Sequence, residues 1–195
     1  MTGQISAPGH SAEWAEGVLH FWFDELTRAD WFNRSDALDQ VIQKRFKDLH
    51  AELTALTPHA SWMSARQSLA AVIVFDQFPR NMFRGTAQAF ASDSLALQIA
   101  RDAIAQGHDE ALGDALAVTG RLFMYLPFEH SEDLADQDLA VALISKLGDD
   151  EFTRYAIAHR DIIVKFGRFP HRNKVLGRPS TAEETAFLTQ PGSSF

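Results

Sequence analysis

Three short segments of the sequence gather charged and imidazole side chains in patterns that could support proton transfer or anion binding. The first runs from Asp76 to Asn81 (DQFPRN), with Arg84 shortly after it. Asp76 follows the apolar residues Leu69–Ile73 at helical spacing, so its carboxylate falls on the buried face of a helix. A buried carboxylate is costly unless it is paired, and Arg80 lies near enough in sequence to pair with it. The segment predicts either an ion pair that fixes the loop or a general base beside cationic ligand anchors.

The second segment is Pro127–Asp133 (PFEHSED), in which polar side chains follow a proline that we expect to end a helix. Glu132 and Asp133 suit the first turn of the next helix, because negative charge is favourable near a helix N-terminus. Capping does not explain Glu129 and His130, which we expect in the loop. A carboxylate beside an imidazole can transfer protons, since histidine titrates near neutral pH. The alternative is that His130 only hydrogen-bonds the loop backbone.

The third segment joins the end of a helix to a loop, Gly167–Pro179, that is rich in glycine, proline and cationic side chains. His159 lies on the apolar stripe of that helix, where a lone histidine is expected to be a hydrogen-bonded core residue. Arginine matches the geometry of carboxylates and phosphates, so the loop favours an anion-binding pocket. The alternative is that its arginines cap helix C-termini or pair with Asp76, Glu129 or Glu132. The polar residues that the segment contributes are His159, Arg168, His171, Arg172, Asn173 and Arg178.

Taken together, the segments predict one pocket that performs acid–base chemistry on a small anionic molecule or simply binds it. The predicted catalytic residues are Asp76, Glu129, His130 and His171. The predicted ligand-binding residues are Arg80, Asn81, Arg84, His159, Arg168, Arg172, Asn173 and Arg178. No serine, cysteine or lysine stands out as a nucleophile, so hydrolysis, elimination or isomerisation fits better than covalent catalysis. Two alternatives stay open: a helical scaffold that binds a protein or peptide, and polar loops that only stabilise the fold.

Metal and cofactor motifs are missing from the sequence. No His-x-x-His, His-Glu-x-x-His or Glu-x-x-His spacing occurs, and the chain has no cysteine, so no metal site is predicted. Neither a P-loop nor a dinucleotide-binding glycine loop occurs, so no cofactor is predicted.

Helices must position these segments, because apolar residues recur every three or four positions and no stretch alternates with period two. We expect about eight helices, arranged in antiparallel pairs. Their expected spans are 12–26, 35–57, 60–77, 86–106, 109–126, 131–148, 150–166 and a short helix from 180. Ser35 is expected to cap the second helix, Pro79 and Pro127 to end the third and fifth, and Ser180 with Glu183 to form a capping box.

Composition limits the class of protein. The net charge of −8 argues against general nucleic-acid binding, which needs a basic face. The longest apolar run, Leu69–Phe75, is too short to span a bilayer, so no membrane association is predicted. We expect residues 1–11 to be a disordered lead-in and residues 12–195 to form a single domain. The absence of cysteine fits a cytoplasmic protein, and the 15 phenylalanines are compatible with a homodimer.

The motifs together resemble a mainly bacterial family, domain of unknown function 924. The resemblance is carried by FWF at 21–23, DQFPRN at 76–81, PFEHSE at 127–132, FGRFPHRN at 166–173 and LGR at 176–178, with Ser180, Thr181 and Glu184. It covers the chain from about Val18 to Phe195. It implies an all-helical, tetratricopeptide-like fold and no particular activity, so the function has to be argued from the residues.

Overall fold

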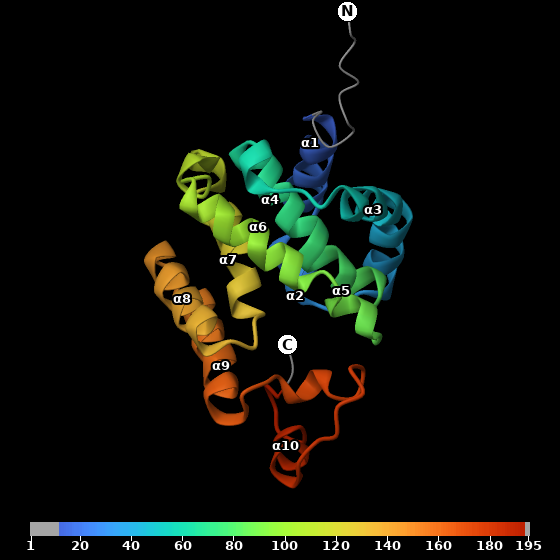
Figure 1. The fold of residues 1–195 in the computed structure, drawn as a ribbon, viewed down its shortest axis with the longest axis vertical. Coiled ribbons are helices and arrows are strands. Elements are labelled where there is room, and N and C mark those ends of the chain that lie inside the picture. The colour runs from blue at the N-terminus through green and yellow to red at the C-terminus, as the bar shows by residue number, and fades with distance from the viewer. Residues whose placement is uncertain (1–11, 194–195) are drawn as a thin grey trace, which may run out of the picture. The chain divides into compact units, whose positions relative to one another are not determined.

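Residues 12–193 are described by the computed structural model, and within them the chain forms helices and helical turns without any β-strand (Figure 1). The α-helices are α1 (Glu13–His20), α2 (Arg28–Phe32), α3 (Asp36–Leu56), α4 (Ala65–Val72), α5 (Phe78–Met82), α6 (Asp93–Ala105), α7 (Thr119–Glu129), α8 (Leu134–Ile144), α9 (Asp150–Phe166) and α10 (Ala182–Phe187). The predicted all-α class is confirmed, whereas the predicted disorder of residues 1–11 lies outside the described residues. None of the described helices is long and apolar enough to cross a membrane.

The chain divides into two compact units. Unit 1 comprises Met1–Arg84 and Gln88–Pro127, and unit 2 comprises Gly85–Ala87 and Phe128–Phe195. Unit 1 therefore contains α1 to α6 and most of α7, and unit 2 contains α8, α9 and α10. The single domain over residues 12–195 and the tetratricopeptide-like pairing of helices stay predictions.

The core of unit 1 is built around α4. This helix packs against α1 and α6, and α3 packs against α5 (Figure 1). Every residue of Leu69–Phe75 is completely buried, which explains the longest apolar run in the sequence. Phenylalanine rings fill the space beside it, with ring centroids 4.9 Å apart for Phe21 and Phe46 and 4.5 Å apart for Phe46 and Phe78. Burial of these side chains supplies the main driving force for folding of this unit.

The helix that carries Asp76 does not end at Pro79, so that prediction was wrong. A π-helical turn, Ile73–Gln77, follows α4 directly, and the N–H of Phe78 donates to the carbonyl of Ile73. Pro79 then lies in the first turn of α5 and donates no backbone hydrogen bond, and the carbonyl of Phe75, four residues earlier, accepts from the Ser92 hydroxyl at 2.7 Å instead. The wider π turn thus lets the chain stay helical through the proline.

The fifth predicted helix also differs from the structure. The region 110–116 forms two short 3₁₀ turns separated by Gly113, whose φ is +77°. Helix α7 starts only at Thr119, contains Pro127 in its interior and ends at Glu129. Glu129 therefore lies in a helix. The sequence analysis had placed it in a loop, so that prediction was wrong. Proline removes one helical hydrogen bond, and the buried side chains of Leu122–Phe128 compensate for it by packing.

Several predicted helix ends are confirmed. The hydroxyl of Ser35 accepts a hydrogen bond from the N–H of Leu38, so Ser35 caps α3. Helix α9 spans Asp150–Phe166 as predicted, and Gly167 ends it in the left-handed conformation with φ +66°. These ends could be predicted because the capping residue itself determines the local geometry.

The cap of α10 lies one residue later than predicted. Thr181, not Ser180, accepts from the N–H of Glu184, and the Glu184 carboxylate accepts from the N–H of Thr181 at 2.7 Å. The hydroxyl of Ser180 instead accepts from the amide of Asn173 at 3.1 Å. This shift brings Glu184, not Glu183, into the polar network of unit 2.

Unit 2 is built on α8 and α9, which lie side by side and are joined by the turn at 145–149 (Figure 1). Its hydrophobic core contains Ile162, Ile163 and Phe169, with Phe166 and Phe187 packed against them. Phe169 is completely buried and comes from the loop after α9. It therefore fixes the predicted Gly167–Pro179 loop against the helix that carries His159.

Candidate functional site

The first predicted group lies in unit 1 and forms a buried ion-pair network. Asp76 is completely buried, and its carboxylate accepts from the Gln77 amide at 2.6 Å. The Arg80 guanidinium lies 3.4 Å from the Asp76 carboxylate and donates to Asp93 at 2.9 and 3.2 Å. It also donates to the Asp76 carbonyl. Arg80 thus forms ion pairs with two carboxylates, which matches the structural alternative considered for Asp76.

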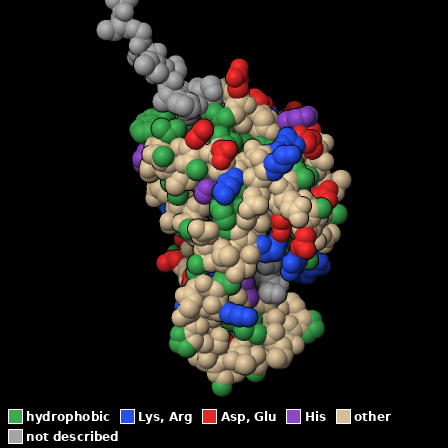
Figure 2. All heavy atoms as spheres, turned by 90° about the vertical axis from the view of Figure 1, so that its right-hand side faces the viewer, with side chains coloured by type: hydrophobic (Ala, Val, Ile, Leu, Met, Phe, Trp, Pro, Cys, Tyr) green, Lys and Arg blue, Asp and Glu red, His purple; other side chains and the backbone are tan. Residues whose placement is uncertain are grey.

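Asn81 and Arg84 both bind Asp39 of α3. The Asn81 amide donates to Asp39 at 2.8 Å, and the Arg84 guanidinium donates to both carboxylate oxygens at 2.6 and 2.8 Å. On the face shown in Figure 2, basic and acidic side chains lie next to each other in the same way. Asp39 and Asp93 were missed as partners, because each is distant in sequence from the arginine that it binds.

The second and third predicted groups meet in unit 2, at a buried carboxylate–imidazole pair. His159 Nδ1 lies 3.0 Å from Oε1 of Glu129 and 2.9 Å from the carbonyl oxygen of Tyr155. Both side chains are buried, with 7% and 5% of their area exposed. Two acceptors face Nδ1, so this nitrogen carries the proton of the neutral ring and Nε2 is its proton-accepting atom.

Gln137 holds the chain segment after this pair. Its side chain is completely buried, and its amide donates to the carbonyl oxygens of Glu129 and Ser131 at 2.6 and 2.7 Å. The turn that carries His130 is therefore fixed from α8. Sequence reasoning missed Gln137, because a single glutamine within an apolar helix carries no motif.

Phe169 gathers the remaining imidazole and guanidinium groups around the pair. Its ring centroid lies 5.7 Å from that of His159 and 5.6 Å from that of His171. The guanidinium carbon of Arg172 lies 4.5 Å from the same centroid, and Arg172 is buried. The ring of His130 is 6.2 Å from that of His159. Helix α7, helix α9 and the 3₁₀ turn Pro170–Arg172 thus each bring side chains to one cluster, which we call the His–Arg cluster (Glu129, His130, His159, His171 and Arg172).

Within the His–Arg cluster, His171 is held neutral. Burial, followed by the charge of the adjacent Arg172, lowers the pKa of His171 from 6.5 to about 3. His159 and His130 lower it further, and Glu132 acts in the opposite direction. At neutral pH this imidazole therefore suits a hydrogen-bonding role better than proton transfer.

Two bidentate ion pairs attach the surrounding loop. Arg178 donates to both oxygens of Glu132 at 2.6 and 2.9 Å, and Glu132 also accepts from the N–H of Phe169 at 2.8 Å. Arg168 donates to both oxygens of Glu184 at 2.6 and 2.9 Å. The hydrogen bonds from Arg168 lower the pKa of Glu184 to about 2. Arg168 and Arg178 therefore hold the loop in place through these ion pairs.

Asn173 connects the two ion pairs. It is almost completely buried, its amide nitrogen lies 3.3 Å from Glu184, and its oxygen accepts from Arg178 at 2.9 Å. This residue was predicted to bind ligand, and its side chain forms hydrogen bonds with Arg178, Ser180 and Glu184. The Arg168, Asn173 and Arg178 side chains therefore position the turn that carries His171 and Arg172.

The predicted site residues thus fall into two groups, each within its own unit. Asp76, Arg80, Asn81 and Arg84 belong to unit 1, and the remaining ones belong to unit 2. The convergence of both groups on one pocket stays a prediction. Within residues 12–193, no cluster of three His, Asp or Glu side chains is arranged to hold a metal ion.

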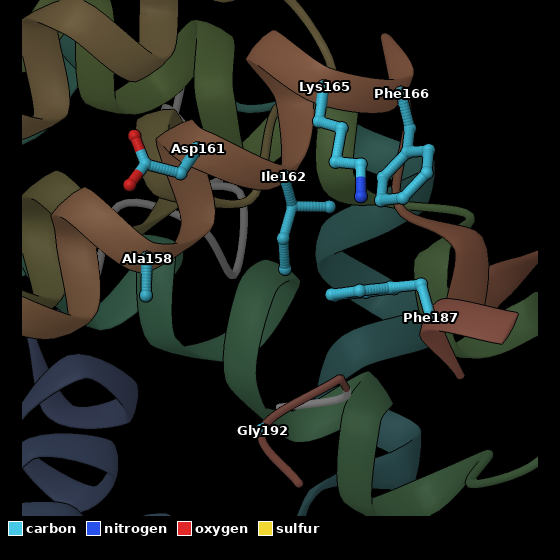
Figure 3. Close-up of a pocket in the computed structure, with 7 residues that line it drawn as sticks. All are labelled: Ala158, Asp161, Ile162, Lys165, Phe166, Phe187 and Gly192. Carbon is cyan, nitrogen blue, oxygen red and sulfur yellow. The ribbon is translucent and has the colours of Figure 1, made fainter. Parts of the chain in front are cut away.

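A separate pocket of about 250 Å³ lies on α9 and α10. Its lining is mainly apolar, with Ile162, Phe166 and Phe187 around the ammonium group of Lys165, as Figure 3 shows. Lys165 lies 3.2 Å from Glu183 and 4.8 Å from the ring centroid of Phe166. Its charge is already balanced there, so the pocket lacks the reactive groups found in the His–Arg cluster.

Comparison with known proteins assigns the chain to a family. A family described as "Bacterial protein of unknown function (DUF924)" matches residues 18–192. The chain belongs to this family. The chain is also similar to a solved structure of a protein of unknown function from Agrobacterium tumefaciens, with 41% sequence identity and a TM-score of 0.82, covering 91% of this chain and 97% of that one. A search of curated proteins finds no match. Membership in DUF924 confirms the resemblance seen in the motifs and names no reaction.

Proposed function

We propose that unit 2 carries an acid–base site for a small anionic molecule, with Glu129 and His159 as the proton-transfer pair. The observation that carries this proposal is the 3.0 Å contact between buried Glu129 and the Nδ1 atom of His159. An isolated buried charge lowers the stability of a protein. A buried carboxylate therefore needs a partner, and here it can orient the imidazole of His159 and stabilise its protonated form.

The pair can act as a general base. Glu129 and the Tyr155 carbonyl keep the proton on Nδ1, so Nε2 accepts a proton from a bound molecule. The carboxylate then stabilises the imidazolium, as the acidic member of a catalytic triad does. Release of the same proton to another atom of the molecule would complete an elimination, an isomerisation or a water-dependent hydrolysis.

Arg172 supplies the positive charge that would hold the anion. Its guanidinium packs on Phe169, and His171 next to it is neutral at physiological pH. His130 and His171 are only partly buried, so they are the members of the His–Arg cluster that solvent and ligand can reach. We assign them hydrogen-bonding roles at the entrance of the site.

A thermal-shift screen tests the proposal. Ligands that bind only the folded state raise the midpoint of unfolding by mass action. We expect a midpoint increase with small carboxylates or phosphate esters that is lost in Arg172→Ala and in Glu129→Gln. Arg84→Ala in unit 1 is the control and should retain the increase. If the ligand-induced increase is equal in all three variants, the His–Arg cluster is not the binding site.

The scaffold alternative has its own supporting observation. Helix α9 exposes Ile157 and Val164, with 41% and 56% of their area accessible, and their spacing of seven residues places them on one face of the helix. Apolar residues that recur along one exposed surface are common where proteins associate. A screen with no small-molecule hit would favour this second function.

A further inference from the structure

We infer that Gln137 is a positioning residue of the proposed acid–base site: its amide caps the end of α7 and so places the carboxylate of Glu129 against His159. This inference rests on the proposed function, because it names the residue that sets the geometry of the proton-transfer pair. The contacts of Gln137, its burial and the number of its donors support it.

Gln137 lies on α8 and is completely buried. Its amide nitrogen lies 2.6 Å from the carbonyl oxygen of Glu129, 2.7 Å from that of Ser131 and 3.5 Å from that of Phe128. All three oxygens are acceptors, so the atom that faces them is the nitrogen and not the oxygen of the amide. An amide nitrogen carries two hydrogens, and the two shorter contacts use both of them.

The carbonyl groups that Gln137 binds lie at the end of a helix. Helix α7 ends at Glu129, and the last four carbonyl groups of a helix have no donor within it. The N–H of Ser131 donates to the carbonyl of Phe128 at 3.2 Å, and Gln137 donates to that of Glu129. Gln137 therefore caps the C-terminus of α7 from a neighbouring helix, at a place where helices commonly fray.

The capped residue is the one that carries the carboxylate. Oε1 of Glu129 lies 3.0 Å from Nδ1 of His159 on α9, and α9 packs against α8. Gln137 thus connects the backbone of Glu129 to the pair of helices that carries His159. A displacement of about 1 Å would break a hydrogen bond of this length, and a displacement of that size can lower the rate of an enzyme about 100-fold.

Ser131, in contrast, is held by α8 in two ways. Its carbonyl accepts from Gln137, and its hydroxyl donates to Asp136 at 2.9 Å. The N–H of Asp133 also donates to this hydroxyl, at 3.2 Å. Loss of the amide donors should therefore displace Glu129 more than Ser131.

The chemistry of the amide explains why glutamine suits this position. A hydroxyl or a protonated carboxylic acid donates one hydrogen and could serve one carbonyl. The cation of a lysine or arginine would bring a charge into a buried place, which is costly. Methionine has a similar length and volume and no donor. Gln137→Met therefore removes the cap and largely keeps the packing.

NMR of the His159 imidazole in the full chain, labelled with ¹⁵N and kept at neutral pH without any ligand, tests the inference. In the unaltered protein we expect a proton on Nδ1 that resonates at low field, because the Glu129 carboxylate accepts it. The Tyr155 carbonyl lies on the same helix as His159 and also faces Nδ1, so a proton on Nδ1 does not by itself report on Gln137. In Gln137→Met we expect this resonance to move upfield and its exchange with water to become at least about tenfold faster.

Ser92→Ala is the matched control. The hydroxyl of Ser92 donates to the carbonyl of Phe75 at 2.7 Å, so this variant also removes a buried donor from a helix carbonyl, but in unit 1. It should lower the thermal midpoint and leave the Nδ1 proton of His159 unchanged. Equally fast exchange in both variants would reduce the effect of Gln137→Met to a general loss of stability and would overturn the inference.

The possible failures are distinguishable. If Nδ1 of His159 carries no proton in the unaltered protein, the proton-transfer pair is wrong and the proposed function fails with it. If Nδ1 is protonated and its resonance and exchange are the same in Gln137→Met, the positioning role is overturned and the proposed function stands.

The unaltered chain decides the matter if Gln137→Met does not fold. The side-chain amide hydrogens of Gln137 should be protected from exchange at least as well as the Nδ1 proton of His159, each relative to an unstructured peptide. Free exchange of these amide hydrogens would show that the contacts with Glu129 and Ser131 do not persist, and the inference would be wrong.

Discussion

Asp76 is completely buried at the end of the core helix of unit 1, and its carboxylate is held by Gln77 and Arg80. Asp76→Asn keeps the shape of the side chain and removes its charge. We expect the free energy of unfolding to fall by about 3 kcal/mol, which is typical when one partner of a buried ion pair is lost while the other remains. Urea denaturation measures this change. Asp114→Asn, at an exposed position of the same unit, is the control and should be nearly neutral.

The size of that loss also bears on function. A large decrease in stability, with no effect on a ligand-induced thermal shift, would identify Asp76 as a structural residue. A small decrease together with loss of the ligand-induced shift would instead support the catalytic role predicted from the sequence. The two outcomes are separable because stability and binding are measured independently.

His171 makes stability depend on pH. Its pKa is about 3 in the folded protein and near 6.5 in an unfolded chain, so the unfolded state takes up the proton first as the pH falls. The contribution of His171 is fully present above about pH 6.5 and is lost progressively down to about pH 3. Between pH 7 and pH 5 the loss amounts to about 2 kcal/mol.

We therefore expect His171→Gln to reduce the pH dependence of unfolding. Urea denaturation at pH 7 and pH 5 should show a free-energy difference about 2 kcal/mol smaller in this variant than in the unaltered protein. Equal pH dependence in the unaltered protein and His171→Gln would show that this imidazole is not held neutral.

The sequence could predict contacts between residues that are close in the chain. Asp76 and Arg80 are four positions apart on a helix, so their ion pair follows from helical geometry. The pairing of Glu129 with His159 could not be predicted, because the two residues are far apart in the sequence and no motif links them. The sequence placed His159 as a core histidine and Glu129 in a loop. Their contact agrees with the core position expected for His159 and is the observation on which the proposed proton-transfer role rests.

At the scale of elements, prolines were the main source of error. Pro79 and Pro127 were expected to end helices, and both lie within helical structure. The π-helical turn before Pro79 changes the hydrogen-bond spacing, so that the helix can continue past the proline. No sequence pattern predicts such a turn. The end of α9 at Gly167 was predicted correctly, because glycine readily adopts the positive φ that ends a helix.

Two helical glycines should respond in opposite ways to alanine substitution. Gly120 of α7 is buried, and an added Cβ would lie 2.7 Å from Leu116 Cβ and 3.2 Å from side-chain carbons of Leu112 and Leu69. Overpacking of this kind typically costs about 1–3 kcal/mol, which exceeds the gain in helix propensity. We expect Gly120→Ala to lower the thermal midpoint.

Gly17 of α1 is the matched case. No atom lies within 4 Å of a Cβ added there, and the position is exposed. Gly17→Ala should raise stability by up to about 1 kcal/mol, because alanine restricts the unfolded chain and favours the helix. Circular dichroism melts of both variants check the pair. If Gly120→Ala also stabilises the protein, α7 is not packed closely at that position.

At the scale of the whole molecule, the helical class could be predicted from periodicity, and the helices of residues 12–193 confirm it. The division into two compact units could not be predicted from the sequence. No composition shift marks the boundary, since Pro127 and Phe128 are consecutive residues of one helix. Boundaries are visible in a sequence when a polar linker separates the units, and this chain has none there.

The exposed side chains of α8 and α9 lead to a prediction about the oligomeric state. Helix α9 exposes Tyr155, Ile157 and Val164, and α8, packed beside it, exposes Leu134 and Leu139. Exposed apolar side chains on neighbouring helices are common where proteins associate. A second copy of the chain is the occupant that needs no other protein, so we expect a homodimer with twice the 21.7 kDa chain mass.

Light scattering after size exclusion measures this mass directly. Val164→Glu places a charge on the exposed surface of α9, where 56% of the valine is accessible, and should give the monomer mass. Val118→Glu alters a valine that is 42% accessible in unit 1 and should remain dimeric. Monomers in the unaltered protein would rule out the homodimer and leave the α8–α9 surface to a different partner. Dissociation by Val118→Glu instead of Val164→Glu would place the interface on unit 1. Both substitutions add the same charge, so a difference between them reports on location and not on the net charge of the chain.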